Sequence, residues 1–184
     1  FFGSKNLCYP IICYNVTISS VGYSTLFLNY PVTIPYGVEA HTASGVEGEW
    51  LKMEELDGII PANTAVVLKG HEGNYEFKLA KEPRTVVENI FTGTLYKQTI
   101  TKEDGTSYYV LANIDNEVGF YNAKNGNNTN QFINAANKAY LTIPAATQTV
   151  FYGFRFDNGE TTGINGVSEQ NPEVNTIYDL QGRK

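Results

Sequence analysis

Apolar and polar residues alternate in several short segments of the chain, and this alternation is the main structural signal in the sequence. Three segments show it over five residues each: 14–18, 75–79 and 97–101. A period of two places successive side chains on opposite faces, as in a strand with one buried and one solvated face. These segments are therefore predicted to be β-strands with one face in water.

Denser apolar runs predict strands that are covered on both faces. They lie at 25–28, 108–111 and 150–154, where Gly153 is a candidate for a β-bulge. The segment 50–56 has apolar positions compatible with a strand or a short helical turn, and we favour the strand. Asp104-Gly105 suits a type I′ turn, which predicts a hairpin over 100–108.

A short phrase occurs twice. Ile60-Pro61-Ala62 precedes one apolar run, and Ile143-Pro144-Ala145 precedes another, at a spacing of 143 − 60 = 83 residues. Proline cannot donate to a sheet ladder, so each copy is expected at a strand entrance or edge. The spacing is too long for a solenoid repeat. Two interpretations stay open: two related halves, or the ordinary recurrence of proline at strand entrances.

Together these patterns predict an all-β protein, an antiparallel β-sandwich or a barrel-like domain with the option of two related halves. A chain of 184 residues is long enough to bury a substantial core. We expect one module over 14–156, after an unassigned segment 1–13. Residues 157–175 are rich in Gly, Asn, Glu, Thr and Ser and are predicted to be a linker. Residues 176–184 are predicted to begin another element, with a short terminal strand at 176–180.

The net charge of the chain and the lengths of its apolar runs argue against two kinds of partner. The chain has 13 basic and 19 acidic residues, so its formal net charge at pH 7 is −6. A negative protein gains nothing from phosphate counterion release, so we expect no nucleic-acid partner. No apolar run approaches the ~20 residues that span a bilayer, so we expect no membrane span.

The sequence predicts neither a metal site nor a cofactor. Cys8 and Cys13 are the only cysteines, and His41 and His71 the only histidines. Four such ligands could hold zinc, but their spacing does not resemble a zinc motif. Whether Cys8 and Cys13 form a disulfide is left open, because geometry decides it.

No group of residues names a reaction, so the chain is predicted not to be an enzyme. Cys13 could pair with His41 as a nucleophile, but it lies in an apolar run where a thiol is inert. Residues 22–26 lack the last glycine of a Gly-x-Ser-x-Gly elbow. Two carboxylates at the right separation could cleave a glycosidic bond. Among 19 acidic residues, however, some pair always lies at such a distance, so proximity alone indicates nothing.

Aromatic residues are the most suggestive feature for binding. The chain has 13 tyrosines and a single tryptophan, Trp50. Aromatic faces can stack on sugar rings, which makes Trp50, Tyr108 and Tyr109 candidate ligand-binding residues. Tyr108 and Tyr109 are adjacent, so their rings point to opposite faces of a strand and only one could join an exposed platform. The alternative is that these side chains simply pack in the sheet.

Residues 177–184 read Ile-Tyr-Asp-Leu-Gln-Gly-Arg-Lys. This segment resembles the opening of the C-terminal sorting tail that many exported Bacteroidetes proteins carry, including cargo of type IX secretion. The body is similar to an uncharacterised β-rich module that precedes such tails in secreted and surface proteins of that phylum. The segments that carry this likeness are 22–27, 60–70, 137–141 and 160–164. The resemblance implies a secreted or cell-surface location and a structural module.

We therefore expect a non-catalytic accessory or structural module of an exported bacterial surface protein, one part of a multidomain parent chain, that serves spacing, display or adhesion. Its partners would be a glycan or another surface protein. The first alternative is a carbohydrate-binding module that targets an attached enzyme to polysaccharide. The second is a fragment of a hydrolase.

Overall fold

The computed structural model describes residues 13–81, 88–123, 130–144, 149, 151–156 and 159–162. Cys8, most of the predicted linker and the terminal segment 176–184 with its predicted strand lie outside the described residues, as does nearly all of segment 1–13. The described residues form strands and no helix, so the all-β prediction is confirmed. This part of the chain accordingly holds no helix that is long and apolar enough to cross a membrane.

Fifteen strands are present in the described residues. In chain order they are β1 (Cys13–Ile18), β2 (Tyr23–Leu26), β3 (Val32–Thr33), β4 (Val38–Glu47), β5 (Trp50–Glu55), β6 (Ile59–Ile60), β7 (Val66–Gly70), β8 (Gly73–Lys78), β9 (Phe91–Thr94), β10 (Gln98–Thr101), β11 (Thr106–Ile114), β12 (Glu117–Asn122), β13 (Gln131–Asn134), β14 (Lys138–Pro144) and β15 (Phe151–Phe156). The predicted strands at 14–18, 75–79 and 97–101 correspond to β1, β8 and β10. Segment 50–56 is a strand, β5, as favoured.

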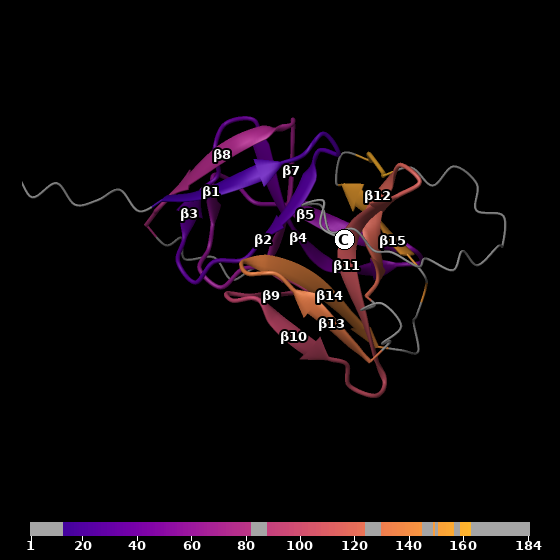
Figure 1. Cartoon of the computed structure of the whole chain (residues 1–184). Helices are drawn as coiled ribbons and strands as arrows, with labels where there is room; N and C mark the ends of the chain where they lie inside the picture. Colours follow the sequence, from indigo (N-terminus) through magenta and orange to yellow (C-terminus); the bar gives the residue numbers. More distant parts are fainter. Residues whose placement is uncertain are drawn as a thin grey trace, which may run out of the picture.

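Nine strands form one large sheet in the order β2-β7-β4-β5-β15-β12-β11-β14-β9 (Figure 1). Three two-stranded ribbons accompany it: β1 with β8, β3 with β6, and β10 with β13. Figure 1 shows the β1–β8 and β10–β13 ribbons at separate places on the large sheet. The pairs are antiparallel except that β15 runs parallel to β5. The sheet is therefore mixed, with one parallel pair among otherwise antiparallel strands.

The large sheet contains two halves with the same strand order. The order β2-β7-β4-β5, with the β3–β6 ribbon beside it, recurs seven strands later as β9-β14-β11-β12 with the β10–β13 ribbon. Strand β15, which lies between β12 and β5, has no such place in the first half, and the β1–β8 ribbon has no counterpart among the described strands of the second half. The option of two related halves therefore describes the observed topology.

The registers of the two halves also agree. Partners in β9–β14 are displaced from those in β2–β7 by 66 and 74 residues (92 − 26 and 140 − 66), and the two corresponding ribbons show the same displacements. The corresponding pairs are Leu26–Val66 and Thr92–Tyr140 in the large sheet, and Val32–Ile60 and Gln98–Asn134 in the ribbons. A single strand order could recur by chance, but equal registers at two places indicate a repeated structural unit.

The repeat has one local sequence signature. Asn63 and Asn137 both have a φ of 58°, in the left-handed region that asparagine tolerates better than most residues. Asn63 N donates to Leu28 O at 2.8 Å, and Asn137 N donates to Thr94 O at 2.8 Å. Each asparagine follows an alanine and stands two residues before another. The Ile-Pro-Ala phrase, in contrast, lies before β7 in the first half and at the end of β14 in the second, so it does not mark the repeat.

Hydrogen bonds between β2 and the start of β14 bring the two ends of the sheet together. Phe27 N donates to Asn137 O at 3.0 Å, and Asn137 Nδ2 donates to Phe27 O at 3.0 Å. Ala139 N donates to Thr25 Oγ1 at 3.1 Å. A Cβ at Gly93 would lie 2.1 Å from Phe27 Cγ, so only glycine permits this close approach. The sheet is thus nearly closed.

Asn89, just before β9, joins the second half to the first. Its Nδ2 donates to Ala65 O at 2.7 Å, and its Oδ1 accepts hydrogen bonds from Phe91 N at 3.1 Å and Ala43 N at 3.4 Å. Ile90 N donates to Ala43 O at 2.9 Å. One partly buried amide therefore satisfies backbone groups of three segments.

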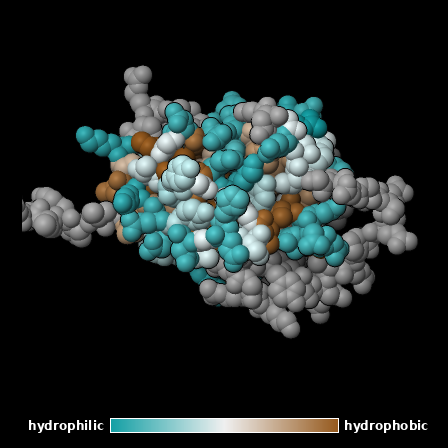
Figure 2. All heavy atoms as spheres, turned by 90° about the horizontal axis from the view of Figure 1, so that it is seen from above, coloured by the Kyte–Doolittle hydropathy of each residue, from teal (hydrophilic) through white to brown (hydrophobic). Residues whose placement is uncertain are grey.

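The inner face of the nearly closed sheet holds the main core. Phe120 is fully buried there and its ring centroid lies 5.0 Å from that of Phe91 and 6.0 Å from that of Phe154. Two further cores lie on the outer face, where the ribbons cover it. One includes Ala40, Leu68 and Phe77, and the other includes Tyr108, Phe132 and Tyr140. The remaining surface, seen from above, is mostly hydrophilic with small apolar patches (Figure 2).

The predicted hairpin at 100–108 is wrong. Strand β10 pairs with β13, whereas β11 pairs with β12 and β14. Gly105 does adopt a positive φ of 79°, and Thr106 N donates to Glu103 O at 3.2 Å. The turn therefore forms, but it leads from the β10–β13 ribbon to β11 in the large sheet. Strand β10 stays in the ribbon because Ile100 packs against the core that this ribbon covers.

Candidate functional site

Two of the three predicted ligand-binding residues are in the interior. Tyr109 is 0% exposed and faces the main core, where its ring packs 5.1 Å from that of Tyr152. Tyr108 is 6% exposed and lies under the β10–β13 ribbon. As expected, adjacent tyrosines point to opposite faces, but both faces are covered here. Neither ring can stack on a ligand in this structure, which corrects their assignment as binding residues.

The third predicted residue, Trp50, is half-buried on the outer face of β5. The inward residues of β5 and its neighbours belong to the main core, for example Leu51, Phe120 and Tyr152. The alternate residues point outward, and no ribbon among the described residues covers them. We call these outward positions the outer strip. They are Trp50, Lys52 and Glu54 on β5, Phe151, Gly153 and Arg155 on β15, and Glu117, Gly119 and Tyr121 on β12.

Two glycines make room for aromatic rings on the outer strip. A Cβ at Gly153 would lie 2.7 Å from Trp50 Cζ3, and a Cβ at Gly119 would lie 2.1 Å from Phe151 Cε2. The rings of Trp50 and Phe151 therefore lie across the backbone of a neighbouring strand. The Tyr121 ring follows, with its centroid 4.7 Å from that of Phe151. Gly153 pairs in regular register with Trp50, so the predicted bulge is wrong and the glycine instead permits close approach.

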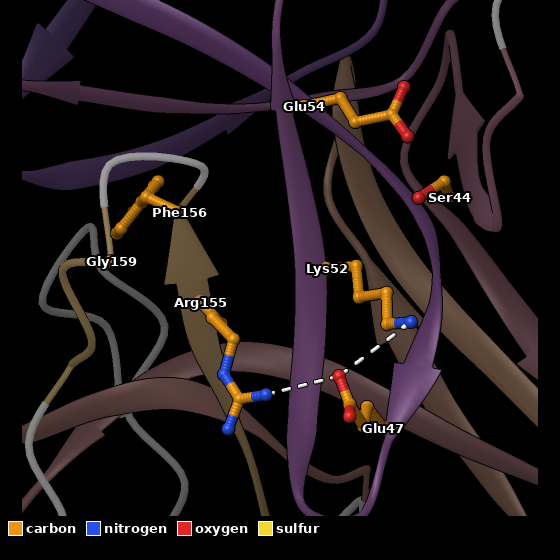
Figure 3. Close-up of a pocket in the computed structure, with 7 residues that line it drawn as sticks. All are labelled: Ser44, Glu47, Lys52, Glu54, Arg155, Phe156 and Gly159. Atoms are coloured by element: carbon orange, nitrogen blue, oxygen red, sulfur yellow. Dashed lines mark hydrogen bonds and ion pairs between the residues drawn. The ribbon is translucent and has the colours of Figure 1, made fainter.

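Charged side chains border Trp50. Arg155 Nη1 lies 3.0 Å from Glu47 Oε2, and Lys52 Nζ lies 3.6 Å from the same oxygen (Figure 3). The Arg155 guanidinium carbon lies 5.7 Å from the centroid of the Trp50 ring, within range of a cation–π interaction. Such exposed pairs contribute only about 0–1 kcal/mol each to stability. Their effect here is to hold Arg155 against the indole.

A groove of about 420 Å³ opens beside these residues. Figure 3 shows Glu47, Lys52 and Arg155 meeting at one end of it, with Ser44 and Glu54 farther along. Its lining residues are Ser44, Glu47, Lys52, Glu54, Arg155, Phe156 and Gly159. Two carboxylates and two cations therefore face one space. Side chains of this kind suit hydrogen bonding to a polar ligand.

A second charged cluster surrounds Lys69. Its Nζ lies 3.1 Å from Glu160 Oε2, 3.4 Å from Glu39 Oε2 and 4.6 Å from the centroid of the Phe156 ring. Burial opposes the charge, but the hydrogen bond with Glu160 and the charge of Glu39 outweigh it and raise the pKa of Lys69. A partly buried cation paired in this way is typical of a structural contact.

The remaining candidate residues are not brought together. His41 is buried in β4, with its Nε2 3.8 Å from Glu39 Oε2 and its ring 4.9 Å from that of Phe156. His71 is exposed in the turn after β7, and Cys13 is exposed at the start of β1. Within the described ranges, no group of three His, Cys, Asp or Glu side chains is placed to hold a metal ion. Cys8 lies outside them, so the disulfide stays a prediction.

Sequence reasoning missed most of the outer strip, including Phe151, Tyr121 and Arg155. These residues come from strands far apart in the sequence, and their proximity depends on β15 entering between β5 and β12. One local signal existed, since Gly153 interrupts an aromatic run at 151–154. A glycine there indicates a bulge or a close approach, and the close approach is what occurs.

The described residues define an all-β domain with a mixed, nearly closed sheet of two equivalent halves and an aromatic, charged strip on one uncovered face. Comparison of the chain with known protein families, with curated proteins and with solved structures finds no match. Its function is therefore inferred from its own residues.

Replacing Gly153 with alanine is expected to move the indole of Trp50. The added Cβ would lie 2.7 Å from Trp50 Cζ3 and 3.2 Å from Thr162 Oγ1, so the ring must shift. Overpacking of this kind costs about 1–3 kcal/mol. Trp50 is the single tryptophan, so its fluorescence reports the change directly, and we expect emission at longer wavelength and a lower urea midpoint. Gly45→Ala is the control, because its Cβ meets nothing within 4 Å and its backbone does not require a positive φ. Unchanged emission of the Gly153→Ala variant would contradict the close approach.

Stability is expected to fall above pH 10. Burial raises the pKa of Tyr14, Tyr23, Tyr109, Tyr121 and Tyr140 above the ordinary value of 10.0. Below pH 10 these tyrosines are neutral in both states. Above it the unfolded chain loses their protons first, so the unfolded state is favoured as the pH rises toward the folded-state pKa values.

Urea unfolding at pH 8 and pH 11 checks this, with a lower midpoint expected at pH 11. Tyr121→Phe should reduce the difference, because Glu117 and Asp115 add to the effect of burial in raising the pKa of Tyr121. Tyr36→Phe, at a fully exposed position, should leave the difference unchanged. Equal midpoints at the two pH values would refute the expectation.

Proposed function

We propose that this chain is a non-catalytic accessory module of an exported bacterial surface protein, and that it serves spacing, display or adhesion. The observation that carries the proposal is the interior of the large sheet. Its core holds six aromatic side chains, and both halves contribute to it. The aromatic side chains are Phe91, Tyr109, Phe120, Tyr152, Phe154 and Phe156. A space packed in this way makes a rigid body and offers little room for a substrate.

The charged groups support the same proposal. Near Trp50 and near Lys69, cations and carboxylates pair with each other at 3.0–3.6 Å. Catalytic groups are instead arranged to act on a bound substrate. The likeness of 177–184 to a sorting tail and the low share of charged residues, 17%, favour an extracellular location.

Two measurements test the proposal: whether the protein is exposed on the cell surface, and whether it hydrolyses polysaccharides. An epitope-tagged form of the complete gene product, expressed in a Bacteroidetes host with type IX secretion, should be cleaved by proteinase K added to intact cells. The purified chain should release no reducing ends from a panel of polysaccharides. Retention of the tag inside the cells would contradict the export, and steady product formation would favour the hydrolase fragment instead.

A carbohydrate-binding module is the second candidate. The outer strip favours it, because three aromatic side chains lie next to charged groups on a face that no described ribbon covers. This role is compatible with an accessory module, since binding alone requires no catalytic group.

A further inference from the structure

We propose that the outer strip binds the sugar rings of a neutral polysaccharide, with Trp50, Phe151 and Tyr121 as the stacking surface. This inference rests on the proposed accessory role and names the ligand of that module. The rings of Trp50 and Phe151 lie across Gly153 and Gly119, which a methyl group would prevent. Sugar rings present flat apolar faces, and aromatic side chains held in place bury such faces at little entropic cost.

The two halves of the fold indicate that a hairpin at this place does not need a tryptophan after its turn. Strands β4 and β5 are joined through the two residues 48–49, and β11 and β12 through the two residues 115–116. Trp50 and Glu117 follow these turns and are therefore equivalent. The second half forms its hairpin through a turn of the same length, without the register shift that β4 has between Ala43 and Gly45, and it has a glutamate where the first half has tryptophan. A tryptophan at this position is thus explained better by a ligand than by the needs of the sheet.

The charges around the rings favour a neutral ligand. Lys52 and Arg155 supply hydrogen-bond donors, and three carboxylates supply acceptors: Glu47, Glu54 and Glu117. With Asp115, whose charge also acts on Tyr121, the formal sum is 2 − 4 = −2, so this surface has no excess positive charge to attract a polyanion. Sugar hydroxyls both donate and accept hydrogen bonds and can use both kinds of group. Because the groove lies beside Trp50, a chain of several sugar rings could extend into it.

Fluorescence of the unmodified protein tests the proposal first. Trp50 is the only tryptophan, so its emission and its quenching by acrylamide report this site alone. Titration with soluble starch and with a mixed-linkage β-glucan should change the emission and protect Trp50 from quenching with at least one of the two polymers. Polygalacturonate, an anionic polymer, should have no such effect. No change with either neutral polymer would overturn the proposal, and a response to polygalacturonate alone would overturn the neutral class.

Affinity electrophoresis in gels that contain the same polymers tests the residues. Trp50→Ala should weaken retardation by about tenfold, and Trp50→Phe should restore part of it. Tyr36→Ala removes a fully exposed aromatic ring away from the strip and should bind as the unmodified protein does. Thermal unfolding of each variant shows whether it is folded. Equal retardation of a folded Trp50→Ala variant would overturn the assignment.

Failure of this proposal can be told apart from failure of the accessory role. Absence of binding without release of reducing ends would leave a spacer module with no polysaccharide ligand. Release of reducing ends in the same mixtures would contradict the non-catalytic role itself.

Discussion

Replacing Phe120 with alanine is expected to lower the free energy of unfolding by about 3–5 kcal/mol. Phe120 is 0% exposed, and its ring packs between those of Phe91 and Phe154, with centroids 5.0 and 6.0 Å away. These partners come from β9 and β15, so the lost contacts connect strands on different parts of the sheet. Urea unfolding followed by far-ultraviolet circular dichroism measures the loss.

Tyr96→Ala is the matched control for this prediction. Tyr96 is 77% exposed, so removal of its ring should change the free energy of unfolding by less than about 0.5 kcal/mol. A loss below about 1 kcal/mol for Phe120→Ala would show that the interior collapses around the cavity, and it would contradict the rigid core on which the proposed spacer role depends.

Replacing Asn89 with alanine is expected to cost about 3 kcal/mol, because one amide joins the two halves through three hydrogen bonds. Each buried backbone group that is left without a partner costs about 1–3 kcal/mol. The groups concerned are Ala65 O, Phe91 N and Ala43 N, at 2.7, 3.1 and 3.4 Å from the Asn89 side chain. The same urea experiment measures the effect.

Two further variants separate the contributions at this position. Asn89→Asp keeps an acceptor for Phe91 N and Ala43 N but places a carboxylate oxygen against Ala65 O, so at neutral pH it should also be less stable than the unmodified protein. Asn74→Ala removes an exposed amide that accepts from Thr17 Oγ1 at 2.6 Å, and it should change stability by less than about 0.5 kcal/mol. If Asn89→Ala behaved like Asn74→Ala, the seam between the halves would not depend on this side chain.

The individual strands could be predicted because their signal is local. Alternation at 14–18, 75–79 and 97–101 gave the right elements, and the ambiguous segment 50–56 proved to be a strand. The pairing of strands could not be predicted in the same way. Asp104-Gly105 has the residues of a hairpin turn, yet β10 and β11 pair with other strands. A turn fixes the direction of the chain over four residues, whereas burial of Ile100 under distant residues decides which edge it joins.

The candidate site shows the same division. Trp50 was identified from residue type alone, because it is the only tryptophan. Tyr108 and Tyr109 were chosen for the same reason, but the β10–β13 ribbon covers one and the main core surrounds the other. Phe151 and Gly119 have no sequence neighbour that signals their contact. They meet because β15 lies beside β12.

The amino-acid sequence by itself determined that this protein is built of strands, that many have one wet face, and that it holds few charges. These properties follow from side-chain periodicity and composition, which act over a few residues. The tertiary structure decided which strands pair, that two halves repeat one register, that β15 runs parallel to β5, and which aromatic rings remain on the surface. Those features depend on contacts between segments that lie tens of residues apart in the sequence. Local sequence does not distinguish one strand pairing from another, so the free energy of burying an apolar face decides which pairing forms.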